Sequence, residues 1–394
     1  MSLNEKEHVG ANGINFDNFG YGPWDAMDVD ARVWEEGEYS LLYRKMVNFL
    51  DFVLNSDMAA FRVEVGSKGH KSVKVLSLKL ANCYRNFNGI PNICFPGYAC
   101  SPDVALFLDC YASHREISCC TFVNASWNVI DGLTEAEIFN DFVVYMRREA
   151  KRRGVKKSMR DWMYGLTKAQ RDSIRAYLRT MPNKSTKLLC VRCELQYRTV
   201  AVSGDHVRLR EFVGSVPARL VDTRAERGAP ECAARIDMGR AMEDRDSFFD
   251  NPLGKDKDLF EHLIGRLWKT EQDKRGIIHH HALLVFDGQH VKDEFAALDR
   301  VAVRWKAVTH GAGYLHSTHH EKQKLIDEGR WHYGRIDCRE GEMEALEAMI
   351  DDAAEYFTKD TQPVRFKPTP HARTLVKGWP RKPRQGGPGR PRKV

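Results

Sequence analysis

The chain has 394 residues, of which 42% are hydrophobic and 29% charged, which is ordinary for a soluble globular protein of two or three domains. The first residues, MSLNEKEHVGANGIN, lack the basic and apolar regions of a secretory signal, and no apolar run approaches the length of a membrane span. Ten cysteines without such a signal indicate reduced thiols, so we expect a cytoplasmic protein with no membrane partner.

Positive charge is concentrated at the C-terminus. The formal net charge is +7, and residues 377–394, KGWPRKPRQGGPGRPRKV, contain seven basic residues and no acidic one. Because Gly, Pro and unopposed charge bury little apolar surface, we expect a disordered basic tail. Its PGRPRK stretch resembles an AT-hook, in which Arg390, Arg392 and Lys393 would contact DNA. A tail that only improves solubility is the alternative.

Residues 1–130 form the first predicted region, which has mixed structure and an unknown role. Hydrophobic periodicity favours a helix over 39–54 and strands near 60–65 and 73–80. No motif that carries chemistry stands out here, so the cysteines and aromatic residues of this region are interpreted as core.

Residues 131–184 form a helical, basic connecting segment. Thr134 has the spacing of a capping box and predicts a helix to about Arg153, and Thr167 begins a similar pattern for a helix that ends before Pro182. The end of the first helix is interpreted either as a solvated face or as a DNA contact. Its basic residues are Arg147, Arg148, Lys151, Arg152, Arg153, Lys156 and Lys157.

Residues 185–376 carry the clearest pattern, which predicts an α+β domain. Apolar and polar residues alternate over 187–197, a half-buried strand with Arg192 and Glu194 on its polar face. Two apolar stretches on either side of QDKRG predict a β-hairpin. Helices are expected over 232–249, 291–308 and 340–358, the last with an apolar stripe of Met343, Leu346, Ile350, Ala353 and Phe357.

Three adjacent histidines begin the second strand of this hairpin, in GIIHHHALLVF. Because a strand alternates its side chains, His279 and His281 share one face and His280 points to the other. Glu271 lies on the neighbouring strand and would complete a site of two imidazoles and one carboxylate. Such a set suits Mn²⁺ or Mg²⁺, and zinc on ligand type alone. Glu194 is the rival third ligand, and a solvated polar strand end is the alternative to a metal site.

The stretch EYFTK, in the last predicted helix, places Tyr356 and Lys359 three residues apart on one helix face. A phenol is a poor nucleophile until a cation favours its phenolate. Lys359 would supply that cation and also neutralise phosphate oxygens. The alternative is an amphipathic tyrosine at the edge of the helix packing.

Taken together, these motifs resemble those of HUH endonucleases, the rolling-circle replication initiators and relaxases. More closely, residues from about 185 to 378 resemble the YagK/YfjJ C-terminal-domain family, which is related to filamentous-phage-type replication initiators. Residues 1 to about 180 lie outside the resemblance. The matching stretches are LLCVRCELQYR, LIGRLWKTEQDKRGIIHHHALLVFDGQHV, GAGYLHSTHH, WHYGRI and EYFTKDTQPVRFKP.

The resemblance implies a ferredoxin-like fold, with a central antiparallel sheet flanked by helices. It further implies that His279, His281 and Glu271 hold the metal and that Tyr356 attacks DNA, leaving a 5′-phosphotyrosyl link and a free 3′-OH. Arg192 would contact the DNA backbone from the first strand.

The implied substrate is single-stranded or hairpin origin DNA of a plasmid or phage-like element, with host polymerase and helicase as further partners. The alternatives are a relaxase for DNA transfer, a DNA-binding regulator without catalysis, and an unrelated metal enzyme such as a cupin-type oxygenase.

Overall fold

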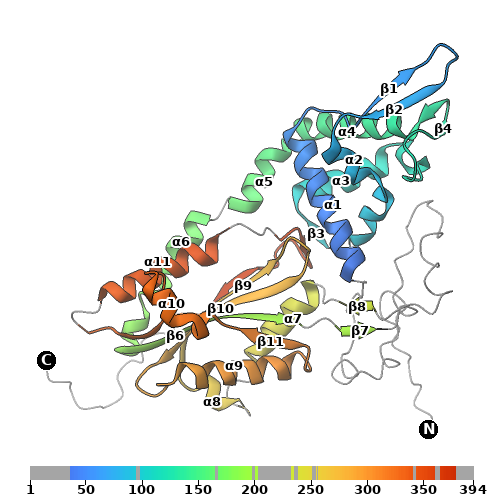
Figure 1. Cartoon of the computed structure of the whole chain (residues 1–394). Coiled ribbons are helices and arrows are strands. Elements are labelled where there is room, and N and C mark those ends of the chain that lie inside the picture. Colours follow the sequence, from blue (N-terminus) through green and yellow to red (C-terminus); the bar gives the residue numbers. More distant parts are fainter. Residues whose placement is uncertain are drawn as a thin grey trace, which may run out of the picture.

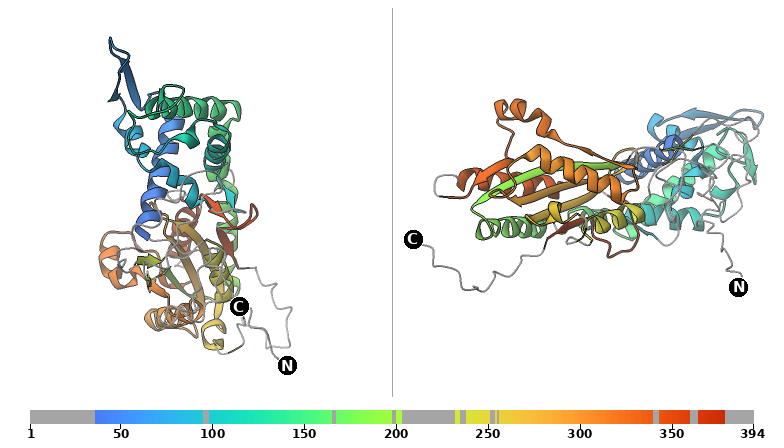
Figure 2. Two further views of the ribbon diagram at one scale, coloured as in Figure 1. Left: turned by 90° about the vertical axis from the view of Figure 1, so that its right-hand side faces the viewer. Right: turned by 90° about the horizontal axis from the view of Figure 1, so that it is seen from below.

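The computed structural model describes residues 36–94, 98–164, 167–197, 200–202, 232–234, 238–250, 254, 256–339, 343–359 and 364–378. The described chain is an α+β structure that is elongated, with an N-terminal unit and a sheet-containing C-terminal unit placed end to end (Figures 1 and 2). No helix among the described residues is long and apolar enough to cross a membrane.

The N-terminal unit is a helical domain around an aromatic core, from which the β1–β2 hairpin projects (Figure 1). Phe87 lies at its centre and packs edge-on against Phe49, Phe107 and Phe139. Such offset contacts add to the stabilisation that burial provides. The elements are α1 (Glu36–Asn55), β1 (Phe61–Val65), β2 (Lys71–Val75), α2 (Leu78–Tyr84), β3 (Ala99–Cys100), α3 (Pro102–Ser113), β4 (Asn128–Ile130), β5 (Leu133–Thr134) and α4 (Glu135–Arg152), with 3-10 helices at Phe87–Ile93 and Ile117–Cys119.

Two helices connect the units. α5 (Val155–Tyr164) follows α4 and contributes Val155 to the N-terminal core, whereas α6 (Thr167–Leu178) contributes to the core of the C-terminal unit. The capping box predicted at Thr134 is present, because its side chain accepts from the Glu137 N–H and Glu137 in turn accepts from the Thr134 N–H.

The C-terminal unit contains an antiparallel sheet in the order β11-β6-β10-β9-β14, and β12 also pairs with β6. β10 lies in the middle, paired with β6 on one side and with β9 on the other. The strands are β6 (Lys187–Tyr197), β9 (Leu263–Gln272), β10 (Ile278–Asp287), β11 (Gly313–His316), β12 (Gly334–Asp337) and β14 (Leu375–Lys377). β7 (Val200–Val202) and β8 (Cys232–Ala234) form a separate pair, and β13 (Phe366–Lys367) pairs with β3 of the N-terminal unit.

Helices cover both faces of this sheet (Figure 1). One face packs against α6 and α11 (Met343–Thr358), and the core between them includes Leu283 and Val285 of β10. The other packs against α7 (Met238–Phe248), α8 (Lys257–Phe260) and α9 (Glu294–Val308), with Leu284 and Phe286 of β10 buried there. The short helix α10 (Lys322–Asp327) and the 3-10 helices at Met181–Asn183 and Thr318–Glu321 complete the unit.

The predicted hairpin is confirmed, and its turn packs against helix α1. Tyr43 donates from its hydroxyl to Gln272 Oε1 at 3.2 Å. Gly276 has φ +81°, and a Cβ atom there would lie 2.5 Å from a ring carbon of Tyr39, so both the backbone and the close approach require glycine. The N-terminal unit therefore supports the end of the hairpin at which the histidines stand.

Three sequence predictions need correction. The strand expected near 73–80 ends at Val75, because Ser77 caps the new helix α2 by accepting from the Leu80 N–H. The helix expected over 232–249 begins only at Met238, since Cys232–Ala234 pairs with β7 as a strand. Met343, expected in the apolar stripe of α11, is 46% exposed because it occupies the first residue of the helix.

Candidate metal and tyrosine site

The two strands of the hairpin bring the predicted metal ligands together. Glu271 on β9 lies directly opposite His279 on β10, and His281 follows on the same face. The Nε2 atoms of His279 and His281 are 3.2 Å apart, and His281 Nε2 is 3.2 Å from Glu271 Oε2. Among the described residues, Glu271, His279 and His281 form a group of three side chains that could hold a metal ion, and their ligand atoms lie within 4.8 Å of one another.

The rival third ligand, Glu194, lies on the other side of the imidazole of His281. It is opposite His281 across the β6–β10 pair, and its Oε1 atom is 3.5 Å from His281 Nδ1. Both His279 and Glu271 approach His281 at Nε2. The geometry therefore favours Glu271 as the third ligand and leaves Glu194 for a different role.

Tyr356 contacts the same imidazole from α11, which packs on one face of the sheet. Its hydroxyl oxygen lies 2.7 Å from His281 Nδ1, and the Glu194 carboxylate is close enough to raise the pKa of Tyr356. A cation bound at Nε2 would require the proton of His281 to lie on Nδ1, from which it can donate to the phenol oxygen. This tautomer leaves the lone pair of Nε2 directed toward His279 and Glu271, as metal binding requires.

The surroundings of Tyr356 act on its acidity in opposite directions. Burial raises the pKa of Tyr356 above its usual range, the Arg192 guanidinium lowers it, and the carboxylates of Glu194 and Glu271 raise it again. The net result is a phenol that keeps its proton at neutral pH in the protein alone. Additional positive charge in the cluster would reduce this barrier to ionisation.

Arg192, predicted to contact the DNA backbone, lies between two tyrosine rings. Its guanidinium is 4.8 Å from the centre of the Tyr333 ring and 4.5 Å from that of Tyr356, and it pairs with Asp352 at 3.7 Å. These contacts place a delocalised cation against the face of the Tyr356 ring. The cation beside the tyrosine is therefore Arg192 of β6.

The main chain of Arg192 is hydrogen-bonded by side chains of the segment that follows β11. Along β6, the pairing with β12 ends at Cys190 and the pairing with β11 begins at Glu194. The main chain of Arg192 therefore lies between these two partner strands. His319 Nε2 accepts from its N–H at 3.2 Å, and Ser317 Oγ donates to its carbonyl oxygen at 3.0 Å. Side chains thus replace the missing ladder partners.

Lys359, the predicted cation, is exposed at the end of α11. A second lysine, Lys269, is buried in the site and was missed by sequence reasoning. Lys269 Nζ is 2.6 Å from Glu271 Oε1 and donates at 2.8 Å to the carbonyl oxygen of Lys359. Strand alternation could have found it, because Lys269 and Glu271 are two residues apart on one face.

Lys269 also influences the carboxylate of Glu271. Burial by itself raises the pKa of Glu271, but the hydrogen bond from His281 and the Lys269 ammonium outweigh it and hold this pKa below its ordinary value. The carboxylate is therefore ionised at neutral pH. Its Oε1 atom is engaged by Lys269, so Oε2 remains for a metal ion.

His280 points away from this site, as predicted. It is fully buried on the opposite face, where Nδ1 lies 3.0 Å from Thr270 Oγ1 and Nε2 lies 3.3 Å from the hydroxyl of Tyr197. Both ring nitrogens thus have protein partners. The middle histidine of the three is a structural residue.

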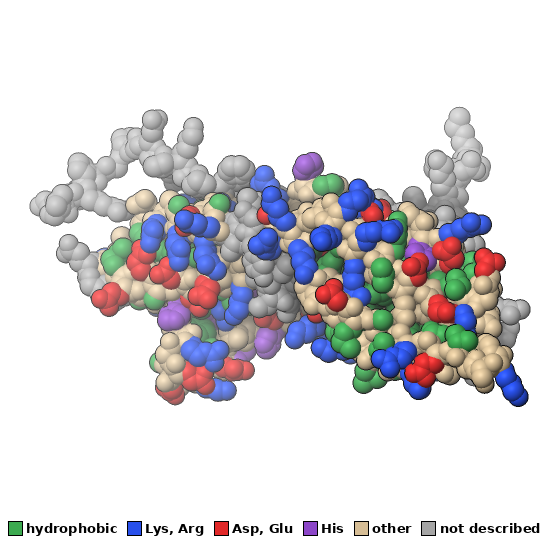
Figure 3. All heavy atoms as spheres, turned by 90° about the horizontal axis from the view of Figure 1, so that it is seen from above, with side chains coloured by type: hydrophobic (Ala, Val, Ile, Leu, Met, Phe, Trp, Pro, Cys, Tyr) green, Lys and Arg blue, Asp and Glu red, His purple; other side chains and the backbone are tan. Residues whose placement is uncertain are grey.

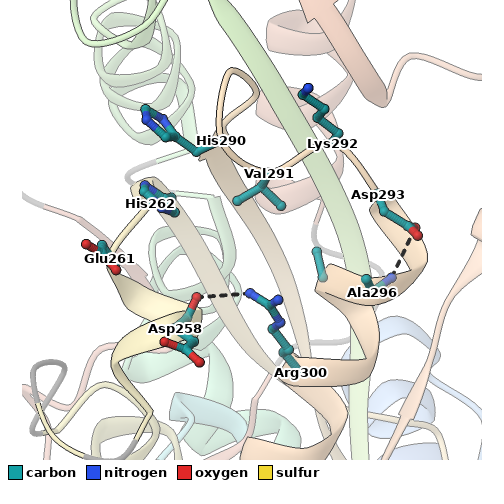
Figure 4. Close-up of a pocket in the computed structure, with 10 residues that line it drawn as sticks. Asp258, Glu261, His262, His290, Val291, Lys292, Asp293, Ala296 and Arg300 are labelled. Atoms are coloured by element: carbon teal, nitrogen blue, oxygen red, sulfur yellow. Dashed lines mark hydrogen bonds between the residues drawn. The ribbon is translucent and has the colours of Figure 1, made fainter.

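A surface pocket of about 340 Å³ lies at the opposite end of the hairpin (Figure 4). His262 and His290 stack there with ring centres 4.4 Å apart, and Arg300 donates to the carbonyl oxygen of Asp258. His290 Nδ1 lies 3.1 Å from the Asp287 carboxylate oxygen Oδ2. The described residues of this pocket do not include a second three-ligand cluster.

The donor set of the site fits a divalent cation. Two imidazole nitrogens and one carboxylate oxygen converge, and burial lowers the pKa of His279, which keeps its ring neutral and available as a ligand. Arg390, Arg392 and Lys393, predicted to contact DNA, lie outside the described residues. No protein-family model, curated protein or solved structure matches this chain.

Proposed function

We propose that the protein is a metal-dependent DNA endonuclease of the HUH type, which nicks single-stranded origin DNA through a covalent tyrosine link. The single observation that carries this proposal is the contact of the Tyr356 hydroxyl with His281, at 2.7 Å, on the ring nitrogen opposite the one that faces His279 and Glu271. A nucleophile and a metal-ligand set therefore share one imidazole.

The ligands would be His279, His281 and Glu271, with Mn²⁺ or Mg²⁺ as the cation. When bound, such a cation supplies positive charge that polarises a phosphate oxygen and fixes the phosphate in place. Lys269 keeps Glu271 oriented by holding Oε1. A group that hydrogen-bonds a metal ligand, as Lys269 does, commonly contributes to the affinity of the site for its metal.

The reaction is a transesterification at phosphorus. The phenol oxygen of Tyr356 attacks the phosphate, the bond from phosphorus to the 3′ oxygen breaks, and the product is a 5′-phosphotyrosyl link with a free 3′-OH. Glu194, whose carboxylate lies beside the same Nδ1 atom as the phenol, would take the phenol proton, and the departing 3′ oxygen takes a proton from water. Arg192 stabilises the negative charge that develops on the phenol oxygen.

The architecture supports this proposal. The two histidines lie on the central strand of an antiparallel sheet, and a helix that packs on the same face carries the tyrosine. This is the arrangement that a ferredoxin-like HUH fold requires. A cupin-type oxygenase would need no such tyrosine helix.

Within this class, we propose a replication initiator of a plasmid or phage-like element. Its covalent link would preserve the energy of the phosphodiester, so that the strand can be resealed after a host helicase and polymerase have acted. A relaxase would use the same residues on a transfer origin. A regulator without catalysis would need neither the ligand set nor the nearby phenol.

The test is a nicking assay on single-stranded oligonucleotides taken from the DNA that flanks the gene, with Mn²⁺, Mg²⁺ or EDTA. The proposal requires cleavage that depends on the cation and a protein–DNA adduct that survives denaturation. Cleavage of transfer-origin oligonucleotides alone would favour the relaxase. DNA binding without cleavage under either cation would favour the regulator.

A further inference from the structure

A strongly basic segment connects the two units. Residues 147–164 contain eight Lys or Arg and two acidic residues, a net charge of +6, although the whole chain carries only +7. The segment comprises the last turns of α4 and the whole of α5. Among the described residues, positive charge is thus concentrated in this segment.

The cations of α5 share one exposed face. Val155 and Met159 pack into the N-terminal core. Lys156, Lys157 and Arg160 lie on the opposite side of the helix and are exposed. Together with two exposed residues of α4 they form what we call the α4–α5 surface: Arg148, Lys151, Lys156, Lys157 and Arg160.

These five cations are not neutralised within the described chain. Their neighbours Arg152 and Arg153 pair with Glu149, but none of the five has a carboxylate of a described residue at ion-pair distance. Figure 3 shows Lys and Arg side chains gathered over α4 and α5. Like charges at this helical spacing repel one another, and a bound polyanion would relieve the repulsion.

We infer that the α4–α5 surface binds the phosphate backbone of double-stranded DNA. Proteins that hold single strands combine cations with aromatic rings on which bases stack. Here Tyr145 is covered by the guanidinium of Arg148, at 5.2 Å, and Trp162 by the ammonium of Lys367, at 4.2 Å. A cationic helix face without free rings fits phosphates rather than unpaired bases.

The surface precedes, in the chain, the helices that position the candidate nucleophile. α5 is followed by α6, and α6 contacts α11 through Arg171, which donates to Thr358 Oγ1 at 3.0 Å, and Arg175, which pairs with Asp351 at 2.8 Å. A duplex on α5 would therefore contact a segment that lies close in the chain to the helix pair that carries Tyr356. The inference goes beyond the proposed function and does not depend on it, because binding to a duplex needs no cleavage.

The experiment measures binding of the full-length protein to a short labelled duplex of mixed sequence, in EDTA, over a range of salt concentrations. The variant Lys156→Gln/Lys157→Gln/Arg160→Gln should bind more weakly, and the slope of log K against log[salt] should become shallower by up to about 3, since each lost phosphate contact removes about 0.9. The matched control, Lys292→Gln/Lys306→Gln/Lys324→Gln, removes three exposed charges from the C-terminal unit and should leave the slope unchanged.

A second variant guards against misfolding. Lys156→Arg/Lys157→Arg keeps the charge and should keep the wild-type slope. Equal losses in the variant and its control, or an unchanged slope in the variant, would overturn the inference. So would a loss seen with a single-stranded oligonucleotide or an RNA duplex of the same length but not with the DNA duplex.

Discussion

The hydroxyl of Tyr356 lies 2.7 Å from Nδ1 of His281, although 75 residues separate them in the chain. The other nitrogen of this imidazole faces His279 and Glu271. One ring therefore belongs to the candidate metal ligands and contacts the phenol at once. A cation bound there would act on the tyrosine through a single side chain.

The two carboxylates near His281 should behave differently when each is neutralised. Glu271→Gln should abolish binding of Mn²⁺, because it removes the charged ligand on the Nε2 side. Glu194→Gln should bind Mn²⁺ almost as the wild type does, yet nick slowly, because it removes the acceptor of the phenol proton. Calorimetric titration with Mn²⁺ measures the first effect. Loss of Mn²⁺ binding in Glu194→Gln, with binding retained in Glu271→Gln, would reverse the two assignments.

Arg192→Met should slow formation of the adduct by about 10²-fold, the usual cost of one lost charge-stabilising group. Binding of Mn²⁺ should not change, since Arg192 does not contact the metal ligands. Lys359→Met should have a smaller effect, because Lys359 is exposed. Single-turnover rates of adduct formation in the two variants check this prediction. A larger loss of rate in Lys359→Met than in Arg192→Met would identify Lys359 as the principal cation.

His319 should make the protein less stable in acid. Burial lowers the pKa of His319 to about 4, below the ordinary value of 6.5, so the unfolded chain binds a proton between these pH values and the folded protein does not. The free energy of unfolding should therefore fall as pH decreases from 6.5 towards 4, by at most about 1.4 kcal/mol per pH unit.

His319→Gln removes this titration while it keeps an acceptor for the Arg192 N–H. Urea unfolding at several pH values should show a shallower pH dependence in the variant. Parallel curves for the two proteins would mean that His319 does not titrate in this range.

The C-terminal tail should contribute to DNA affinity but not to cleavage. Truncation after Gly378 keeps Lys377, which belongs to β14 and donates to the carbonyl oxygen of Ser173, and removes the other six basic residues of the tail. Affinity for DNA should fall and its salt dependence should become shallower. Nicking at saturating DNA should not change. An unaltered salt slope would exclude contact of the tail with DNA.

The sequence predicted those features of the site that depend on strand alternation or on a hairpin. The common face of His279 and His281, the opposite direction of His280 and the approach of Glu271 all follow from a period of two and one turn. The contact of Arg192 with Tyr356 could not be predicted in this way. It depends on how α11 packs across the sheet, and neither residue's local pattern contains that information.

The same reason explains why helical spacing predicts Lys359 as the cation beside Tyr356. Helical spacing identifies residues that share a face, but it does not show which cation a distant strand supplies. Strand alternation places Lys269 on the face of Glu271, but it does not show what the ammonium group contacts. Its role becomes visible only through its contact with the end of α11.

The most direct test of Tyr356 as the nucleophile is to locate the covalent adduct. Wild-type protein is incubated with a single-stranded origin oligonucleotide and Mn²⁺, digested, and analysed by mass spectrometry beside Tyr356→Phe and Tyr333→Phe. Phenylalanine at 356 keeps the ring and costs about 1 kcal/mol of stability for the lost hydrogen bond, so the fold should survive. We expect the nucleotide on the peptide with Tyr356, its absence in Tyr356→Phe and its presence in Tyr333→Phe. An adduct on Tyr333, or one that persists in Tyr356→Phe, would contradict the assignment of the nucleophile, and no adduct with any divalent cation would contradict the proposed enzyme class.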